Sequence, residues 1–161
     1  MEWMRLLERG GPLAERARER ELCRADFARF GLLLSDEALG ELEQVRRAAL
    51  AQTGRVELGP GILAKLAHVL CDSPFLRQDN CAAVLCALVD GFYPLKAESG
   101  ERFSDDELLS LLKSAFDGPA DGSAERACEL AAARCRAVRT GALSVREALQ
   151  KSWPEPGEED D

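Results

Sequence analysis

The sequence predicts an all-α protein, a single-domain helical bundle of about six helices with at most one very short extended segment. Apolar residues recur at intervals of three and four along most of the chain, which is the spacing of one helix face. Ser104 and Ser144 are each followed three residues later by glutamate, the pattern of a capping box at a helix start. Only RVEL, residues 55–58, has the composition of a strand, and it is too short to form a sheet alone.

The first two helices follow from their apolar spacing and their end signals. Cys23, Phe27 and Phe30 fall on one face of an expected N-terminal helix. The second helix begins after Ser35, whose hydroxyl can cap the first turn, and stops before Gly54, a residue type that favours helix ends. We therefore expect two helices before the short extended segment.

The middle of the chain is expected to form the buried centre of the bundle. A third helix begins near Pro60, because proline suits the first turn of a helix. The fourth spans residues 79–96 and is apolar nearly all round, which predicts a central, buried position, with Asp79 or Asn80 as its cap. The last three helices are each expected to begin after a serine: Ser104, Ser123 and Ser144.

Length and composition permit one domain with a core that needs no disulfide. The chain has 161 residues, of which 46% are hydrophobic and 31% charged, and this composition is globular. Residues 1–20 are expected to form a charged N-terminal extension or a peripheral helix, and residues 21–152 the single helical domain. Residues 153–161 are expected to form a disordered acidic tail.

The charge of the chain argues against partners that require a basic surface. The net charge is −8, so nucleic-acid binding is not expected. Arginines near the N-terminus alternate with glutamates such as Glu19, which predicts a solvated helix face. The N-terminus has no apolar signal-peptide core, and the uncharged residues 80–89 are too few to cross a bilayer. We expect a cytoplasmic protein with no membrane contact.

The six cysteines and the single histidine predict core packing rather than chemistry. No Cys-x-x-Cys pair occurs, and Cys128 and Cys135 fall on one helical stripe. We expect reduced, mostly buried thiols, with zinc ligation as the less favoured alternative. His68, Cys71 and Cys81 could share a metal, but we interpret the histidine as a surface residue of a helix. No metal and no cofactor is predicted.

The segment GPGILA, residues 59–64, matches one form of the dinucleotide-binding fingerprint. That fingerprint functions only within a strand–helix–strand unit, and here a second helix is expected to follow. We therefore interpret the segment as a helix start and expect no nucleotide site.

The segment CDSPFLRQDN, residues 71–80, has two interpretations. It carries a thiol, carboxylates, a hydroxyl and amides, which are the side chains that a functional site uses. It also has the features of a turn between helices, because Asp72 or Ser73 can cap a turn that Pro74 begins, and Phe75 can then dock on the core. The turn is the favoured interpretation.

Three segments together resemble a family of uncharacterised bacterial proteins, a domain of unknown function. They are GRVELGPG, LCDSPFLRQDN and FSDDELLSLLKSAFDG, and with their surroundings they span residues 27–118. The resemblance implies a bacterial source and brings no known activity, cofactor or partner. It places the shared pattern on two loops, and loops held by a rigid scaffold often carry binding residues. We therefore expect one polar binding patch at an end of the bundle, formed by Arg55, Glu57, Cys71, Asp72, Ser73, Gln78, Asp79 and Asn80.

The sequence favours a non-enzymatic bacterial helical protein that acts as a protein-interaction or regulatory module, with another protein as its partner. The single histidine and the lack of a recognisable catalytic constellation support this hypothesis. The alternative is a small cysteine- and carboxylate-dependent enzyme or a metal-dependent sensor that uses the Cys71–Asn80 loop. No oligomeric state is predicted.

Overall fold

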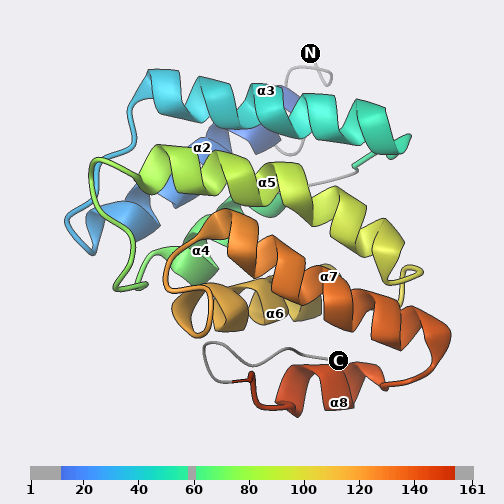
Figure 1. Ribbon diagram of the computed structural model, residues 1–161. Coiled ribbons are helices and arrows are strands. Elements are labelled where there is room, and N and C mark those ends of the chain that lie inside the picture. The colour runs from blue at the N-terminus through green and yellow to red at the C-terminus, as the bar shows by residue number, and fades with distance from the viewer. Residues whose placement is uncertain (1–11, 58–60, 155–161) are drawn as a thin grey trace.

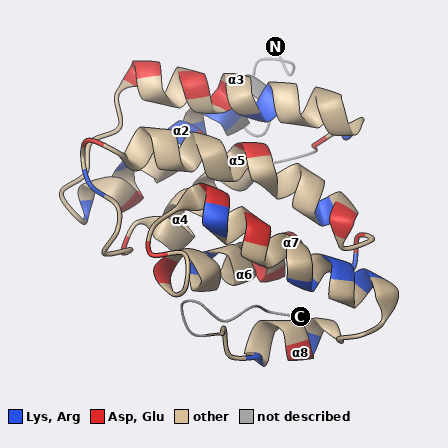
Figure 2. Cartoon of the chain, viewed as in Figure 1, with Lys and Arg blue, Asp and Glu red and all other residues tan. Residues whose placement is uncertain are grey.

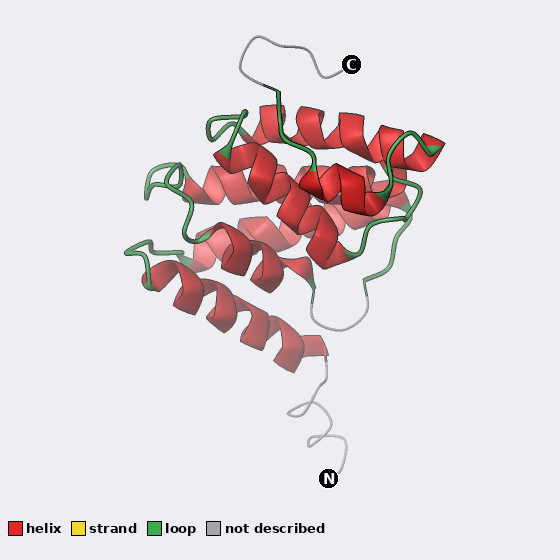
Figure 3. Cartoon of the chain, turned by 90° about the horizontal axis from the view of Figure 1, so that it is seen from below, coloured by secondary structure: helices red, strands yellow, loops and turns green. Residues whose placement is uncertain are grey.

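The computed structural model describes residues 12–57 and 61–154, which form helices and loops without a strand (Figures 1 and 3). The all-α prediction is confirmed. These two ranges contain seven helices: α2 (Pro12–Ala28), α3 (Asp36–Thr53), α4 (Ile62–Leu70), α5 (Cys81–Glu98), α6 (Asp105–Asp117), α7 (Ala124–Thr140) and α8 (Val145–Gln150). Parts of the expected N-terminal extension (1–11), extended segment (58) and acidic tail (155–161) lie outside the described residues.

The helices are arranged in two layers. In Figure 1, α3, α5 and α7 lie side by side in front, and α2, α4 and α6 lie behind them. The short helix α8 packs on α6 and α7. Because α5 contacts α3, α4, α6 and α7, it is the centre of the bundle, as predicted. Its inner face is almost fully buried, through Leu85, Leu88, Val89 and Phe92.

The four predicted serine caps and the stop at Gly54 are confirmed by their hydrogen bonds. The Ser35 hydroxyl accepts a bond from the backbone N–H of the third residue of α3, and Gly54 ends that helix at a φ of 66°. Ser104 and Ser144 each form a complete capping box, and Ser123 caps α7 through its hydroxyl. These bonds satisfy N–H groups that a helix leaves unpaired at its start.

The N-terminal helix differs from the prediction at Phe30. Cys23 and Phe27 are buried as expected, but Phe30 is 48% exposed, because α2 ends at Ala28 and the chain turns away from the core. The N–H groups of Phe30 and Leu32 both donate to the Phe27 carbonyl in that turn. The boundary expected between residues 20 and 21 lies inside α2, so the described part of the extension is continuous with the domain.

The C-terminal end of the described chain is attached by a buried arginine. Arg134 of α7 is 2% exposed and donates hydrogen bonds to the carbonyls of Ala148, Lys151 and Ser152. Its guanidinium carbon lies 3.4 Å from the ring centre of Trp153, whose indole N–H donates to the Ser114 hydroxyl at 2.7 Å. Trp153, expected as the first residue of the tail, therefore packs on the bundle.

The helix α5 runs from Cys81 to Glu98 and contains Pro94. Proline has no N–H, so the carbonyl of Asp90 lacks the donor that the residue four positions later supplies in an uninterrupted helix. Within the two described ranges, none of the helices combines the length and the apolar composition that crossing a bilayer requires.

Candidate functional site

The Cys71–Asn80 loop is a turn whose polar side chains bond mainly to the protein itself. The Ser73 hydroxyl donates to Asp117 at 2.6 Å and accepts from the N–H of Phe75, while Asp72 forms an ion pair with Lys113. That lysine lowers the pKa of Asp72. The loop is therefore fixed to α6, which agrees with its interpretation as a turn.

The end of the Cys71–Asn80 loop is hydrogen-bonded to the segment between α2 and α3. The Gln78 amide accepts from the N–H of Leu33 at 2.7 Å and donates to its carbonyl at 2.9 Å. The Asn80 side chain accepts from the N–H of Arg77 at 2.7 Å and donates to the Phe75 carbonyl at 3.1 Å. Asn80 is the residue before α5, but its side chain makes no capping bond to the helix. The expected cap is replaced by bonds that fold the loop.

The thiol and histidine near this loop do not form a metal site. Cys71 is buried and its thiol donates to the His68 carbonyl, while the His68 ring is exposed and lies 3.3 Å from Asp26. Burial, with Asp26 and Asp72 adding to it, raises the pKa of Cys71 and so disfavours its thiolate. Across the described ranges, no group of three or more His, Cys, Asp or Glu residues is arranged to hold a metal ion.

All six cysteines are free, and four of them are buried. Burial is the largest cause of a raised pKa at every one of these thiols. The prediction of unpaired, mostly buried cysteines is confirmed.

The other expected loop, with Arg55 and Glu57, lies at the opposite end of α5. Arg55 forms a two-pronged ion pair with Glu101, which follows the C-terminus of α5. Asn80 directly precedes the N-terminus of that helix, and its 18 residues are about 27 Å long. The structure therefore does not bring the two loops together into one patch.

Two neighbouring loop residues give a matched test of this arrangement. Asp79→Ala is expected to change the free energy of unfolding by no more than about 0.5 kcal/mol, because Asp79 is exposed and Arg77, at 3.3 Å, is its one ion-pair partner among the described residues. Asn80→Ala is expected to cost about 1–3 kcal/mol, because it removes both loop hydrogen bonds. Urea unfolding of the two variants measures the difference. Equal losses of stability in the two variants would show that Asp79 has a structural role beyond its contact with Arg77.

Glu57 belongs to a buried ion cluster that also contains Glu19, Arg46 and Tyr93. The Arg46 guanidinium donates to both oxygens of Glu19, at 2.7 and 2.9 Å, and lies 3.6 Å from Glu57. The Tyr93 hydroxyl donates to Glu57 at 2.5 Å. Burial raises the pKa of Glu19, and Arg46 opposes that rise. The pKa of Tyr93 is raised by burial and by Glu57.

The buried ion cluster is closed by Gly61 at the start of α4. A Cβ atom at Gly61 would lie 2.3 Å from both Arg46 Nη1 and Glu57 Oε1, so the backbone covers these charges directly. The polar atoms of the cluster bond to one another, and it therefore connects α2, α3 and α5 as a structural element. Glu19 is 3% exposed, so the prediction that it lies on a solvated helix face was wrong. No local signal in the alternating charges of α2 distinguishes it.

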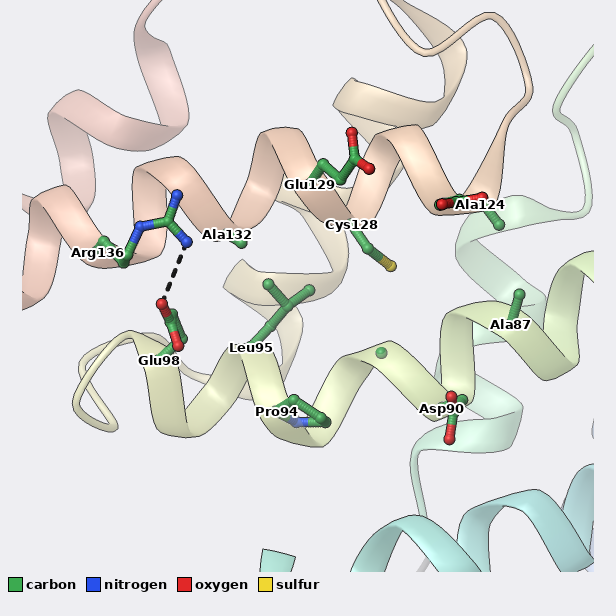
Figure 4. Close-up of a pocket in the computed structure, with 12 residues that line it drawn as sticks. Ala87, Asp90, Pro94, Leu95, Glu98, Ala124, Cys128, Glu129, Ala132 and Arg136 are labelled. Atoms are coloured by element: carbon green, nitrogen blue, oxygen red, sulfur yellow. Dashed lines mark hydrogen bonds and ion pairs between the residues drawn. The ribbon is translucent and has the colours of Figure 1, made fainter. Parts of the chain in front are cut away.

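A groove with a volume of about 500 Å³ lies between α5 and α7 (Figure 4). Its floor consists of small residues that recur every fourth position, which places them on one face of each helix. Gly91 is the point of closest approach, because a Cβ there would lie 2.6 Å from the Cys128 sulfur. The other small residues of the floor are Ala87, Ala124 and Ala132.

The two ends of the groove differ in charge; Figure 2 shows the acidic and basic residues of both helices. At one end, Asp90 of α5 and Glu125 of α7 are exposed, and neither has an ion-pair partner among the described residues. At the other end, Glu98 and Arg136 neutralise each other across the groove at 3.2 Å. Burial, with Asp90 and Glu129 adding to it, raises the pKa of Cys128 to about 11.

The binding patch predicted from the sequence contains no residue that lines this groove. Alanine, glycine and cysteine at every fourth position are also typical of tightly packed helices, so the pattern does not distinguish a buried contact from an open one. In the sequence, Pro94 marks this region as unusual, because it is a helix-breaking residue type inside an apolar helix.

The comparisons with known proteins provide one finding about relatedness. Residues 21–143 match the model of a family described as a family of unknown function, DUF6323. Neither the search of curated proteins nor the search of solved structures gives a match. The matched range covers α3 to α7 completely, and so includes both walls of the groove and most of the buried ion cluster.

Proposed function

This chain belongs to the DUF6323 family of unknown function, and we propose that it is a non-enzymatic protein-interaction module whose partner, another protein, docks in the α5–α7 groove. The observation that carries the proposal is the groove itself. It is open to solvent, has an apolar floor, and lies between two helices that the rest of the bundle holds in place. Its volume of about 500 Å³ is within the range of sites that bind ligands or side chains of a partner.

The surroundings of the cysteines support a non-enzymatic role over the alternative of a thiol enzyme. A nucleophilic cysteine needs a lowered pKa, whereas burial raises the pKa of Cys71 and of every other thiol. The carboxylates of the Cys71–Asn80 loop are engaged with Lys113 and Arg77. The six free thiols support a reducing compartment such as the bacterial cytoplasm.

Filling the groove tests the proposal. Ala87 is exposed and points from α5 towards the start of α7 (Figure 4), so Ala87→Trp is expected to occupy the groove without entering the core. Ala97→Trp is the matched control, because Ala97 is exposed on the same helix and does not line the groove. Both variants are expected to unfold at the same urea concentration as the parent.

The measurement is affinity for a purified partner. Candidates captured from the native bacterium are purified, and each is titrated calorimetrically against the parent and the two variants. A true groove partner is expected to lose at least tenfold in affinity with Ala87→Trp and to keep its affinity with Ala97→Trp. If every partner binds both variants as it binds the parent, the groove is not the docking site and the proposal fails.

A further inference from the structure

We infer that the partner presents a cationic amphipathic helix, with a lysine or arginine at the acidic end of the groove, near Asp90 and Glu125, and an apolar side chain further along the groove. This inference rests on the proposed function, since it specifies the chemistry of the partner at the same groove. It follows from the charges, the backbone and the floor of the groove, which each restrict the occupant in a different way.

The charges of the groove select a cation. Asp90 and Glu125 lie on opposite walls at the same end, and both are exposed without an ion-pair partner in the described ranges. The nearby Glu129 is engaged by Arg126 at 3.3 Å, so the free charge of this end comes from the first two residues. An arginine or lysine that docks at this end gains a charge-assisted contact with a carboxylate, whereas an acidic residue there would be repelled. The net charge of −8 favours the approach of a basic segment.

The backbone at the same end also selects a hydrogen-bond donor. Because Pro94 has no N–H, the carbonyl of Asp90 lacks its usual donor from the residue four positions later. Both residues line the groove. Ammonium and guanidinium groups carry several donors and no acceptor, so one cation can bond to the carboxylate and approach this carbonyl.

The floor and the opposite end select the form of the occupant. Ala87, Gly91 and Ala132 leave room for a third helix to approach two existing helices at about 8–10 Å between axes. Glu98 lies eight residues beyond Asp90, or about 12 Å along α5, and is neutralised by Arg136. Between these charges the floor is apolar, so the cation of the partner is expected to be followed by apolar residues three to eight positions away.

Three synthetic helical peptides of about 16 residues test the inference, since that length is enough for four helical turns. All have the same leucine and alanine positions, and they carry lysine, glutamine or glutamate at the end expected to meet the acidic residues. Fluorescence anisotropy measures their binding to the full chain at low and at physiological salt. The lysine peptide is expected to bind at least tenfold more tightly than the glutamine peptide, and the glutamate peptide more weakly than both. Its advantage is expected to shrink at the higher salt concentration.

The variants locate the binding. Asp90→Asn combined with Glu125→Gln is expected to remove the advantage of the lysine peptide, while Glu41→Gln, an exposed mid-helix carboxylate of α3 without an ion-pair partner in the described ranges, is expected to preserve it. Ala87→Trp is expected to abolish binding of all three peptides. The inference is overturned if the lysine peptide does not bind, if it binds no better than the glutamine peptide, or if the double variant binds it as the parent does.

The two proposals can fail separately. Equal binding of the lysine and glutamine peptides, together with loss of both in Ala87→Trp, would overturn the inference and leave the groove as a docking site. A purified natural partner that ignores Ala87→Trp would overturn the proposed function. Sedimentation of the parent adds one further outcome: a dimer that Ala87→Trp converts to a monomer would identify the occupant as a second copy of this chain and overturn the inference.

Discussion

Arg46→Met is expected to lower the free energy of unfolding by about 3–5 kcal/mol, because it leaves the carboxylate of Glu19 buried without its cation. The same substitution removes the nearest cation from Glu57, whose remaining bond is to Tyr93. Methionine has nearly the volume of the arginine stem, so the loss reflects charge more than a cavity. Urea unfolding at neutral pH, followed by circular dichroism, measures the effect.

The pH dependence identifies the cause. Burial already raises the pKa of Glu19 from its ordinary value of 4.5, and removing Arg46 removes an interaction that lowers it. The folded variant then binds protons that the unfolded chain releases, so its stability decreases as the pH rises from 4.5 through the raised pKa. The deficit relative to the parent is therefore expected to be larger at pH 8 than at pH 5.

A second substitution provides the control. Glu19→Leu together with Arg46→Met is expected to recover most of the lost stability, because an apolar pair can replace a buried ion pair at little cost. The double variant is expected to lose most of the added pH dependence as well. A deficit below about 1 kcal/mol in Arg46→Met, equal at both pH values, would show that water hydrates the buried ion cluster.

Arg134→Leu is expected to destabilise the chain by about 2–4 kcal/mol and to detach its C-terminal part. The three carbonyls of Ala148, Lys151 and Ser152 lose a charged donor, and Trp153 loses its stacking partner. The six residues of α8 are too few to form a stable helix by themselves. We therefore expect both the helix and the indole to leave the surface of α6 and α7.

Trp153 fluorescence reports this detachment directly. The chain has two tryptophans, so Trp3→Phe is introduced into all samples to leave a single reporter. In Arg134→Leu the emission is expected to shift towards the value of a solvated indole before global unfolding. Arg126→Leu, an exposed arginine of the same helix, is the control and is expected to change stability by no more than about 0.5 kcal/mol. An unshifted emission spectrum in Arg134→Leu would contradict the proposed attachment.

Much of the fold could be predicted because its signals are local. The capping serines accept from N–H groups three residues away, and Gly54 ends a helix through its own backbone conformation. The apolar spacing of α5 predicted its burial correctly. The turn at Cys71–Asn80 was also recognisable, since Pro74 and its neighbours have the composition of a turn.

The partners of charged residues could not be predicted in this way. Glu19 and Arg46 are 27 positions apart, and Arg55 pairs with a glutamate 46 positions later. Each of these side chains lies among other charged residues, so many ion pairings are equally compatible with the sequence. The two loops expected to form one polar patch do not meet, because α3 and α5 keep them at opposite ends of the central helix.

The sequence by itself determined the helices, because capping, turn formation and apolar periodicity depend on residues within a few positions of one another. It also determined which helix is central, since α5 is long and apolar nearly all round. The tertiary structure alone decided that Glu19 is buried, that Arg134 holds α8, and that the small residues of α5 and α7 border an open groove. Burial and pairing depend on which faces meet in space, and identical spacings in a sequence can produce either a closed contact or an exposed surface.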